Sequence, residues 1–185
     1  HRQRFEQLCQ PDVASLSDTG RDKKPDIRIV GSLKLNAVST PVNKTFADQL
    51  RAAAGSRPIL LAASTHSPEE QILLKASQEV VRAGYPHLLI IAPRHSDRSQ
   101  DIARLMPQAA HRSKNQLPLL GDNHFLADSF GEMSSLVTAA DIVILGGSFV
   151  PKGGHNPLEI AALSTPLITG PSQFKNKVEF DTLQQ

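Results

Sequence analysis

Residues 146–159, which read G-G-S-F-V-P-K-G-G-H-N-P-L-E, decide the fold class of this chain. They follow the apolar run D-I-V-I-L at 141–145, whose length and β-branched content are typical of a buried strand. They lead into segment 156–163, which we expect to be a helix. Glycine lets the backbone adopt positive φ and approach a ligand closely, and a helix N-terminus favours negative charge. The stretch therefore predicts a strand, a glycine-rich turn and a helix that together bind an anion.

The start of this helix has its own signal. Asn156, Pro157 and Glu159 have the pattern of an N-cap, a first helical position and the third position of a capping box. A purely structural alternative stays open, in which Glu159 only reaches back to its cap and Lys152 is a solvated loop charge. The motif is not a Walker loop, because Lys152 precedes the second glycine pair, and it is not a G-x-G-x-x-G fingerprint.

Strands and helices alternate along the rest of the chain. We expect strands at 27–30, 58–63, 87–92, 117–120, 141–145 and 166–169, and helices at 43–54, 68–83, 96–106, 133–140 and 156–163. This alternation predicts an α/β fold with a doubly wound parallel sheet, whose ligands bind at the carboxyl ends of the strands. Residues 1–26 are expected to be a short amphipathic start and a linker, and residues 27–185 the folded domain.

Composition narrows the classes of function. A single cysteine, Cys9, forms no internal disulfide, and the chain has no Cys/His cluster with zinc spacing. The net charge of +2 is carried by scattered Lys and Arg, and with one Tyr and no Trp the composition argues against a nucleic-acid partner. The longest apolar runs, such as 88–93, are too short to cross a bilayer. We expect a soluble chain with one domain.

Residues that follow the predicted strands should gather at one edge of the sheet. These are segments 31–34, 64–66, 93–95 and 121–122 and the glycine-rich stretch, and they bring Lys34, Arg94, His66, His95 and His155 together. Cations and imidazoles beside a helix N-terminus suit a phosphate or carboxylate. Taken singly, Ser64 and Thr65 are equally explained as caps of the next helix, and Arg94 as the partner of a nearby aspartate. Their convergence predicts an anion site.

Five motifs resemble the 3-deoxy-D-manno-octulosonic acid (Kdo) transferase family of lipopolysaccharide synthesis. They are G-S-L-K at 31–34, A-A-S-T-H-S-P-E-E at 62–70, I-I-A-P-R-H at 90–95, G-E-M at 131–133 and the glycine-rich stretch, in family order. The resemblance implies the GT-B fold, two Rossmann-like domains facing a cleft, and places this chain in the C-terminal, donor-binding half. The N-terminal acceptor domain, with its membrane anchor and general base, is then absent, as are the last helices beyond Gln185.

The resemblance also implies a reaction. Kdo moves from CMP-Kdo to a lipid A precursor (lipid IVA) with inversion at the anomeric carbon, at the cytoplasmic face of the inner membrane of a Gram-negative cell. The isolated, soluble fragment is expected to be inactive. Lys34 aligns with the lysine of the family's G-N-L-K motif and is the candidate catalytic residue, although Ser32 stands where the family usually has Asn. We expect no cofactor and no metal, because helix dipole, Lys and Arg are available to stabilise the leaving CMP.

The family motifs imply which residues bind the donor. Pro93 and Arg94 resemble the nucleotide contact, the G-E-M segment a loop that touches the nucleotide, and 156–159 the segment that holds phosphate and ribose. The full set of candidates is Ser64, Thr65, His66, Pro93, Arg94, Gly131, Glu132, Met133, Gly147, Ser148, Gly153, Gly154, His155, Asn156, Pro157, Leu158 and Glu159. Two alternatives stay open: the donor domain of another GT-B enzyme, such as a UDP-sugar transferase or a nucleotide-sugar 2-epimerase, and a nucleotide-binding module without turnover.

Overall fold

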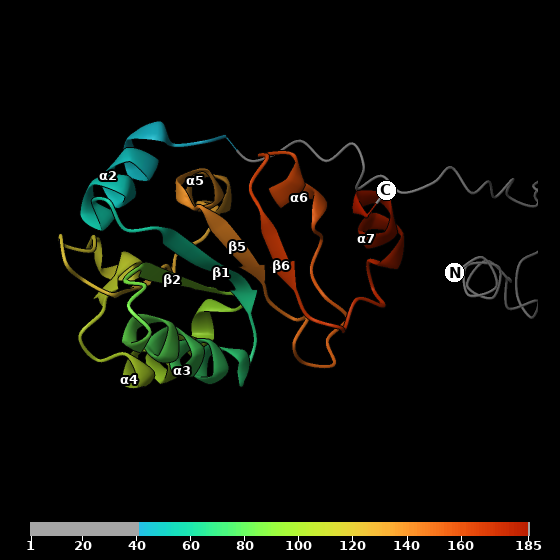
Figure 1. Cartoon of the computed structure of the whole chain (residues 1–185), viewed down its shortest axis with the longest axis horizontal. Helices are drawn as coiled ribbons and strands as arrows, with labels where there is room; N and C mark the ends of the chain where they lie inside the picture. Colours follow the sequence, from blue (N-terminus) through green and yellow to red (C-terminus); the bar gives the residue numbers. More distant parts are fainter. Residues whose placement is uncertain (1–40, 185) are drawn as a thin grey trace, which may run out of the picture. The chain divides into compact units, whose positions relative to one another are not determined.

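The computed structural model describes residues 41–184, which form a six-stranded sheet flanked by helices (Figure 1). The strands are β1 (Ile59–Thr65), β2 (Leu88–Pro93), β3 (Ala110–His111), β4 (His124–Leu126), β5 (Ile142–Leu145) and β6 (Leu167–Thr169), in the order β3-β4-β2-β1-β5-β6. Every paired neighbour is parallel. The predicted α/β class with a doubly wound parallel sheet is confirmed. The predicted strand 27–30, Lys34 and the domain boundary near residue 27 lie outside the described residues.

The helices are α2 (Lys44–Ala54), α3 (Glu69–Arg82), α4 (Ser99–Leu105), α5 (Met133–Ala139), α6 (Leu158–Ala161) and α7 (Lys177–Leu183), with single 3₁₀ turns η2 (Ser96–Arg98) and η3 (Arg112–Lys114). Figure 1 shows α2 and α5 on one side of the sheet and α3 and α4 on the other. None of the helices in the described part is long and apolar enough to cross a bilayer.

The central strands are apolar throughout because both faces of the sheet are covered. Successive residues of β2 alternate between two cores: Ile90 belongs to the cluster that includes Phe46 of α2 and Leu136 of α5, and Ile91 to the cluster that includes Ile102 of α4. Side chains of a strand point alternately to its two faces, so one short run such as L-L-I-I-A at 88–92 supplies both cores.

The predicted helix over 43–54 agrees with α2. Asn43 is its N-cap and accepts the backbone N–H of Phe46 at 3.1 Å, and the helix ends at Gly55, whose φ is 63°. A left-handed residue after the last turn is a standard helix end, and glycine adopts it without steric cost. The helix therefore begins and ends where local signals place it.

Two predicted elements differ from the structure, and some observed elements had no counterpart in the prediction. The expected strand 117–120 is wrong: this segment is a loop in which Leu119 and Leu120 are 73% and 77% exposed. The edge of the sheet is formed instead by β3 and β4, which have two and three residues and are too short for a period of two to be visible. The expected helix 96–106 is divided into η2 and α4, and α7 was not predicted.

The strand order changes direction between β1 and β5, which creates a topological switch point at the carboxyl edge of the sheet. From β1 the chain adds β2 on one side, whereas β5 and β6 lie on the other side of β1. The loops that follow β1 and β5 therefore diverge. In open parallel sheets the crevice at this position is the usual ligand site.

Candidate functional site

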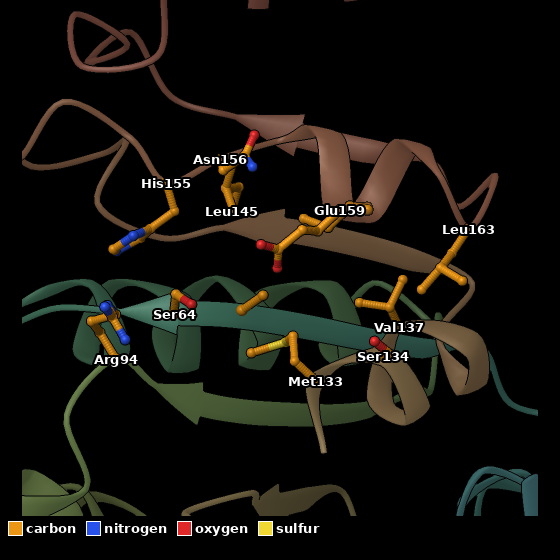
Figure 2. A pocket seen from close by; sticks show the side chains of 12 residues that line it. Ser64, Arg94, Met133, Ser134, Val137, Leu145, His155, Asn156, Glu159 and Leu163 are labelled. Carbon is orange, nitrogen blue, oxygen red and sulfur yellow. The ribbon is translucent and has the colours of Figure 1, made fainter. Parts of the chain in front are cut away.

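A pocket of about 270 Å³ opens at the switch point (Figure 2). Its walls come from the ends of β1 and β5, from the loop after β2, from α5 and from α6. The lining residues are Ala63, Ser64, Arg94, Met133, Ser134, Val137, Leu145, His155, Asn156, Glu159, Ile160 and Leu163. Figure 2 shows Asn156 and Glu159 on one wall and Met133 and Ser134 on the opposite one. The pocket thus combines one carboxylate and one amide with an apolar floor.

A second pocket, of about 410 Å³, shares Arg94, His155 and Asn156 with the first. Its other lining residues are His66, His95, Lys152, Gly154, Lys175 and Asn176. None of the described residues that line it is acidic. We call it the cationic pocket.

The glycine-rich loop is held by a buried carboxylate that sequence reasoning missed. Glu69, 1% exposed at the start of α3, accepts the N–H groups of Gly147 at 2.8 Å, Phe149 at 3.0 Å and His66 at 2.9 Å. The amides of Gly147 and Phe149 are therefore satisfied inside the protein. The only signal for this role was the presence of Glu69 in the S-T-H-S-P-E-E motif.

The second glycine pair is also bonded internally. Gly153 donates to Ser172 Oγ at 3.0 Å, and Gly154 donates to the Gly147 carbonyl at 2.8 Å. Ser148 is completely buried, and its hydroxyl donates to the Leu145 carbonyl and accepts the N–H of Gly170 at 2.8 Å. In this structure the glycine-rich loop shapes the pockets, and its backbone amides at these positions do not point freely at a ligand.

Packing requires glycine at position 146. A Cβ on Gly146 would lie 2.4 Å from the carbonyl oxygen of Ser64, so the ends of β5 and β1 approach too closely for any side chain. Ser64 itself has a φ of 56°, at a bulge where the register between β1 and β2 shifts. This contact holds the ends of β1 and β5 close together at the point where their loops diverge.

Imidazoles line the cationic pocket. The Nε2 atoms of His66 and His155 are 2.9 Å apart with nearly parallel rings, and the His95 ring centroid lies 5.7 Å from that of His66. Burial, then the neighbouring His66 and Arg94, lower the pKa of His155 to about 4. Burial also lowers the pKa of His66, although Glu69 opposes the shift. The His66–His155 pair is therefore uncharged at neutral pH, with one ring donating and the other accepting.

Arg94 has no carboxylate partner among residues 41–184. Asp101, a nearby aspartate that could have been its surface partner, pairs with Arg104 at 2.6 Å instead. The backbone N–H of Arg94 donates to the Thr65 carbonyl at 3.1 Å, which extends the β1–β2 ladder and places the side chain between the two pockets. An exposed, uncompensated guanidinium at this position is suited to bind an anionic group.

A buried ion pair fixes the loop that carries Arg94. Glu70, 1% exposed, receives two hydrogen bonds from Arg98, at 2.8 and 2.9 Å. Burial raises the pKa of Glu70, but the hydrogen bonds from Arg98, the contributions of Thr65 and the backbone, and the charge of Arg98 together outweigh it, so the pKa lies below its ordinary value. The pair joins the start of α3 to η2, four residues beyond Arg94.

The G-E-M segment divides its roles. Met133 lines the first pocket, whereas the Glu132 carboxylate is bound by Arg112, with Nη2 at 2.6 Å, and by the Ser129 hydroxyl. Hydrogen bonds from Arg112 lower the pKa of Glu132. The Arg112 guanidinium also lies 4.3 Å from the centroid of the Phe46 ring. Glu132 thus anchors the loop to the protein core.

The start of α6 differs from the predicted capping box. The helix begins at Leu158 with Pro157 as N-cap, and Asn156 Oδ1 accepts the N–H of Leu158 at 3.1 Å. Glu159 has no hydrogen bond or ion pair within residues 41–184 and does not return to the cap. Its exposed carboxylate remains available to a ligand in the first pocket.

The structure thus brings one part of the predicted set to the pockets, and the rest lie outside both linings. The predicted residues that line a pocket are Ser64, His66, Arg94, Met133, Gly154, His155, Asn156 and Glu159. Those that lie outside both linings are Thr65, Pro93, Gly131, Glu132, Gly147, Ser148, Gly153, Pro157 and Leu158. Lys175 and the apolar wall of α5 were not predicted. In the described part of the chain, no group of three or more His, Cys, Asp or Glu is arranged to hold a metal ion.

No protein-family model matches the chain. It is 39% identical over 157 residues to the 3-deoxy-D-manno-octulosonic acid transferase of Haemophilus influenzae, a match that covers 82% of this chain and 36% of the relative. It is 33% identical over 151 residues to the enzyme of the same name from Rickettsia felis, covering 80% and 32%. The chain therefore spans about a third of the length of these curated relatives.

A solved structure gives a match over most of both chains. The C-terminal CMP-Kdo binding domain of WaaA from Acinetobacter baumannii superposes with a TM-score of 0.67 and 31% identity, covering 74% of this chain and 76% of that one. Fold, motif order and sequence identity agree, and this chain belongs to the 3-deoxy-D-manno-octulosonic acid transferase family.

Proposed function

We propose that this chain is the donor-binding domain of a GT-B glycosyltransferase that moves Kdo from CMP-Kdo to a lipid A precursor, lipid IVA, in lipopolysaccharide synthesis. The observation that carries the proposal is the pair of adjoining pockets, one with a free carboxylate and an apolar floor and one lined by cations, which meet at Arg94. A nucleotide joined to an acidic sugar presents three groups in an order that matches the first pocket, Arg94 and the cationic pocket: a neutral nucleoside, a phosphate and a carboxylate.

The first pocket suits the nucleoside. Glu159 accepts the ribose hydroxyls, since an ionised carboxylate offers two acceptor oxygens. Met133 and Val137 of α5 supply apolar surface for the base, opposite Asn156. Arg94, at the junction with the cationic pocket, meets the phosphate. This arrangement directs the sugar end of the donor, beyond the phosphate, into the cationic pocket.

The chemical step needs stabilisation of the leaving group. As the glycosidic bond breaks, negative charge grows on the phosphate of CMP, and fixed cations facing it lower the barrier. Arg94 serves this purpose here, and Lys34, outside the described residues, is the second candidate. With cations in place, we propose that the reaction needs no metal ion. CMP binding unchanged by excess EDTA is the expected result, and its loss in EDTA would contradict metal independence.

The general base and the lipid acceptor belong, in this proposal, to the other domain of the GT-B enzyme. The parent enzyme then works at the cytoplasmic face of the inner membrane, where its lipid substrate lies. A supporting result is Kdo transfer to lipid IVA by the two-domain enzyme and none by this chain alone.

Nucleotide choice tests the proposal directly. The melting temperature of the chain should rise with CMP and not with UDP or GDP, because ligand at 100 times its dissociation constant stabilises the folded state by about 2.7 kcal/mol. A larger rise with UDP would identify a UDP-sugar enzyme instead. Arg94→Met should weaken CMP binding about tenfold, since hydrogen bonds to charged groups contribute about 1.5–3 kcal/mol. Arg104→Met is the matched control, because Arg104 pairs with Asp101 on the surface.

The role of Glu159 has a separate test. Glu159→Gln should weaken binding of CMP more than binding of 2′-deoxy-CMP, since the deoxynucleotide lacks one of the hydroxyls that the carboxylate accepts. Equal losses for both nucleotides would remove Glu159 from the ribose site.

A further inference from the structure

Lys175 belongs to none of the sequence motifs, yet it is fixed in the wall of the cationic pocket. It lies in the segment between β6 and α7, which folds over the glycine-rich loop. Its backbone N–H donates to the Gly153 carbonyl at 3.1 Å, and Ser172 N–H donates to the Ser148 carbonyl at 2.9 Å. The side-chain amide of buried Asn176 donates to the Gly154 carbonyl at 2.7 Å. These bonds tie the segment to the loop that carries Lys152.

The cations of this pocket are uncompensated. Arg94, Lys152 and Lys175 line it, none of them forms an ion pair within residues 41–184, and no acidic residue of the described chain lies in the lining. Two residues away, Lys177 pairs with Asp181 at 3.0 Å. Like charges that face one concavity repel each other, and an anionic ligand relieves that repulsion.

A single phosphate does not account for all three cations. Arg94 lines both pockets and stands at the phosphate position of the proposed donor, whereas Lys152 and Lys175 line the cationic pocket alone. They approach it from different segments, one from the glycine-rich loop and one from the segment after β6. Two positive charges therefore remain beyond the phosphate, on the side away from the nucleoside.

We propose that Lys152 and Lys175 form a second anion subsite that binds the carboxylate of the donor's acidic sugar. This inference rests on the proposed function and adds to it the residues that distinguish an acidic sugar from a neutral one. A neutral sugar would leave both ammonium groups without a counter-charge while displacing water from them. The subsite thus selects for the acidic donor and also penalises the neutral one.

The test is a cycle of variants and ligands measured by calorimetry on the 185-residue chain. The ligands are CMP, CMP-Kdo and an analogue of CMP-Kdo whose carboxylate is replaced by a carboxamide. The variants are Lys175→Met, Lys152→Met, the charge-retaining Lys175→Arg, and Lys177→Met as a control of the same type outside the pocket. Each lysine is exposed, and thermal melts check that every variant is folded.

Lys175→Met and Lys152→Met should each weaken CMP-Kdo binding about tenfold, as expected for loss of one charge-assisted contact. Binding of CMP and of the carboxamide should change less than twofold, Lys175→Arg should retain most of the affinity, and Lys177→Met should behave as the unmodified chain. Unchanged CMP-Kdo binding in both Met variants, or an equal loss for all three ligands, would overturn the subsite. If the unmodified chain binds neither CMP nor CMP-Kdo, the proposed function itself fails.

Discussion

The Glu69 carboxylate accepts the N–H of Gly147 at 2.8 Å, across 78 positions of sequence. This bond joins the start of α3, after β1, to the loop after β5. With the bonds from Phe149 and His66, it makes one buried side chain the common anchor of both walls of the switch point. The glycine-rich loop therefore owes its position to an internal anion.

Replacing this anchor should loosen the site. Glu69→Gln leaves one acceptor oxygen and turns an NH₂ group toward a backbone N–H, so at least one buried amide loses its partner at a cost of about 1–3 kcal/mol. We expect that loss in the free energy of unfolding, measured with urea, together with weaker CMP binding. The control is Glu79→Gln, because Glu79 forms an exposed pair with Arg82 on the same helix. An unfolding free energy equal to that of the control would refute the anchor.

The buried Glu70–Arg98 pair should matter more than the surface pairs. Arg98→Met leaves the Glu70 carboxylate buried without its counter-charge, which costs about 3–5 kcal/mol for such pairs. Arg104→Met, which breaks an exposed pair with Asp101, should cost less than about 1 kcal/mol. Urea denaturation at pH 7 measures both.

The Glu70–Arg98 pair should also make the free energy of unfolding depend on pH. Because the pKa of Glu70 lies below its ordinary 4.5, the folded state holds the carboxylate ionised where the unfolded chain already takes up a proton. The contribution is fully present above pH 4.5 and is lost as the pH falls through the folded-state pKa. This loss should be smaller in Arg98→Met. A parallel pH profile in the two proteins would contradict the assignment.

His155 should give a pH dependence of stability with the same sign, at a higher pH. Its folded pKa of about 4 lies below its ordinary 6.5, so between these values the unfolded chain binds a proton that the folded chain excludes. Stability from this group is complete above pH 6.5 and falls on the order of 1–3 kcal/mol by pH 4. His155→Gln should remove that slope. If the imidazole signal of His155 in the NMR spectrum of the folded chain titrates near pH 6.5, its pKa is not lowered and this prediction is wrong.

Alanine substitutions at Gly146 and Gly84 separate two costs of replacing a glycine, which are steric overlap and backbone strain. Gly146→Ala places a Cβ 2.4 Å from the Ser64 carbonyl oxygen, and forcing β1 and β5 apart should cost about 1–3 kcal/mol or more. Gly84→Ala meets nothing within 4 Å, so only its φ of +93° is strained, at about 1–2 kcal/mol. Gly146→Ala should also weaken CMP binding, whereas Gly84→Ala should not. Equal CMP affinity in both variants would separate Gly146 from the site.

The strands that sequence predicts well are those with a long local signal. β1, β2 and β5 are continuous apolar runs with turn residues at their ends, and burial on both faces is the reason for that pattern. β3 and β4 are two and three residues long and draw their hydrogen bonds from neighbours already in the sheet. Leu119 and Leu120 carry a strand-like composition and no partner strand, which is why the prediction there was wrong.

The sequence by itself determined the parallel α/β sheet, the glycine-rich turn after β5 and the gathering of Arg94, His66 and His155 at one edge. These features could be predicted because apolar runs, helix signals and the position of a residue just after a strand can all be read from short segments of sequence. Only the tertiary structure decided that the Glu69 carboxylate accepts hydrogen bonds from backbone N–H groups of the glycine-rich loop. It also decided that Asn176, which donates to the Gly154 carbonyl across 22 positions, brings its neighbour Lys175 into the cationic pocket. Charge and hydrogen-bond partnership depend on distances in space, and no local pattern encodes which of two distant groups will satisfy a buried amide.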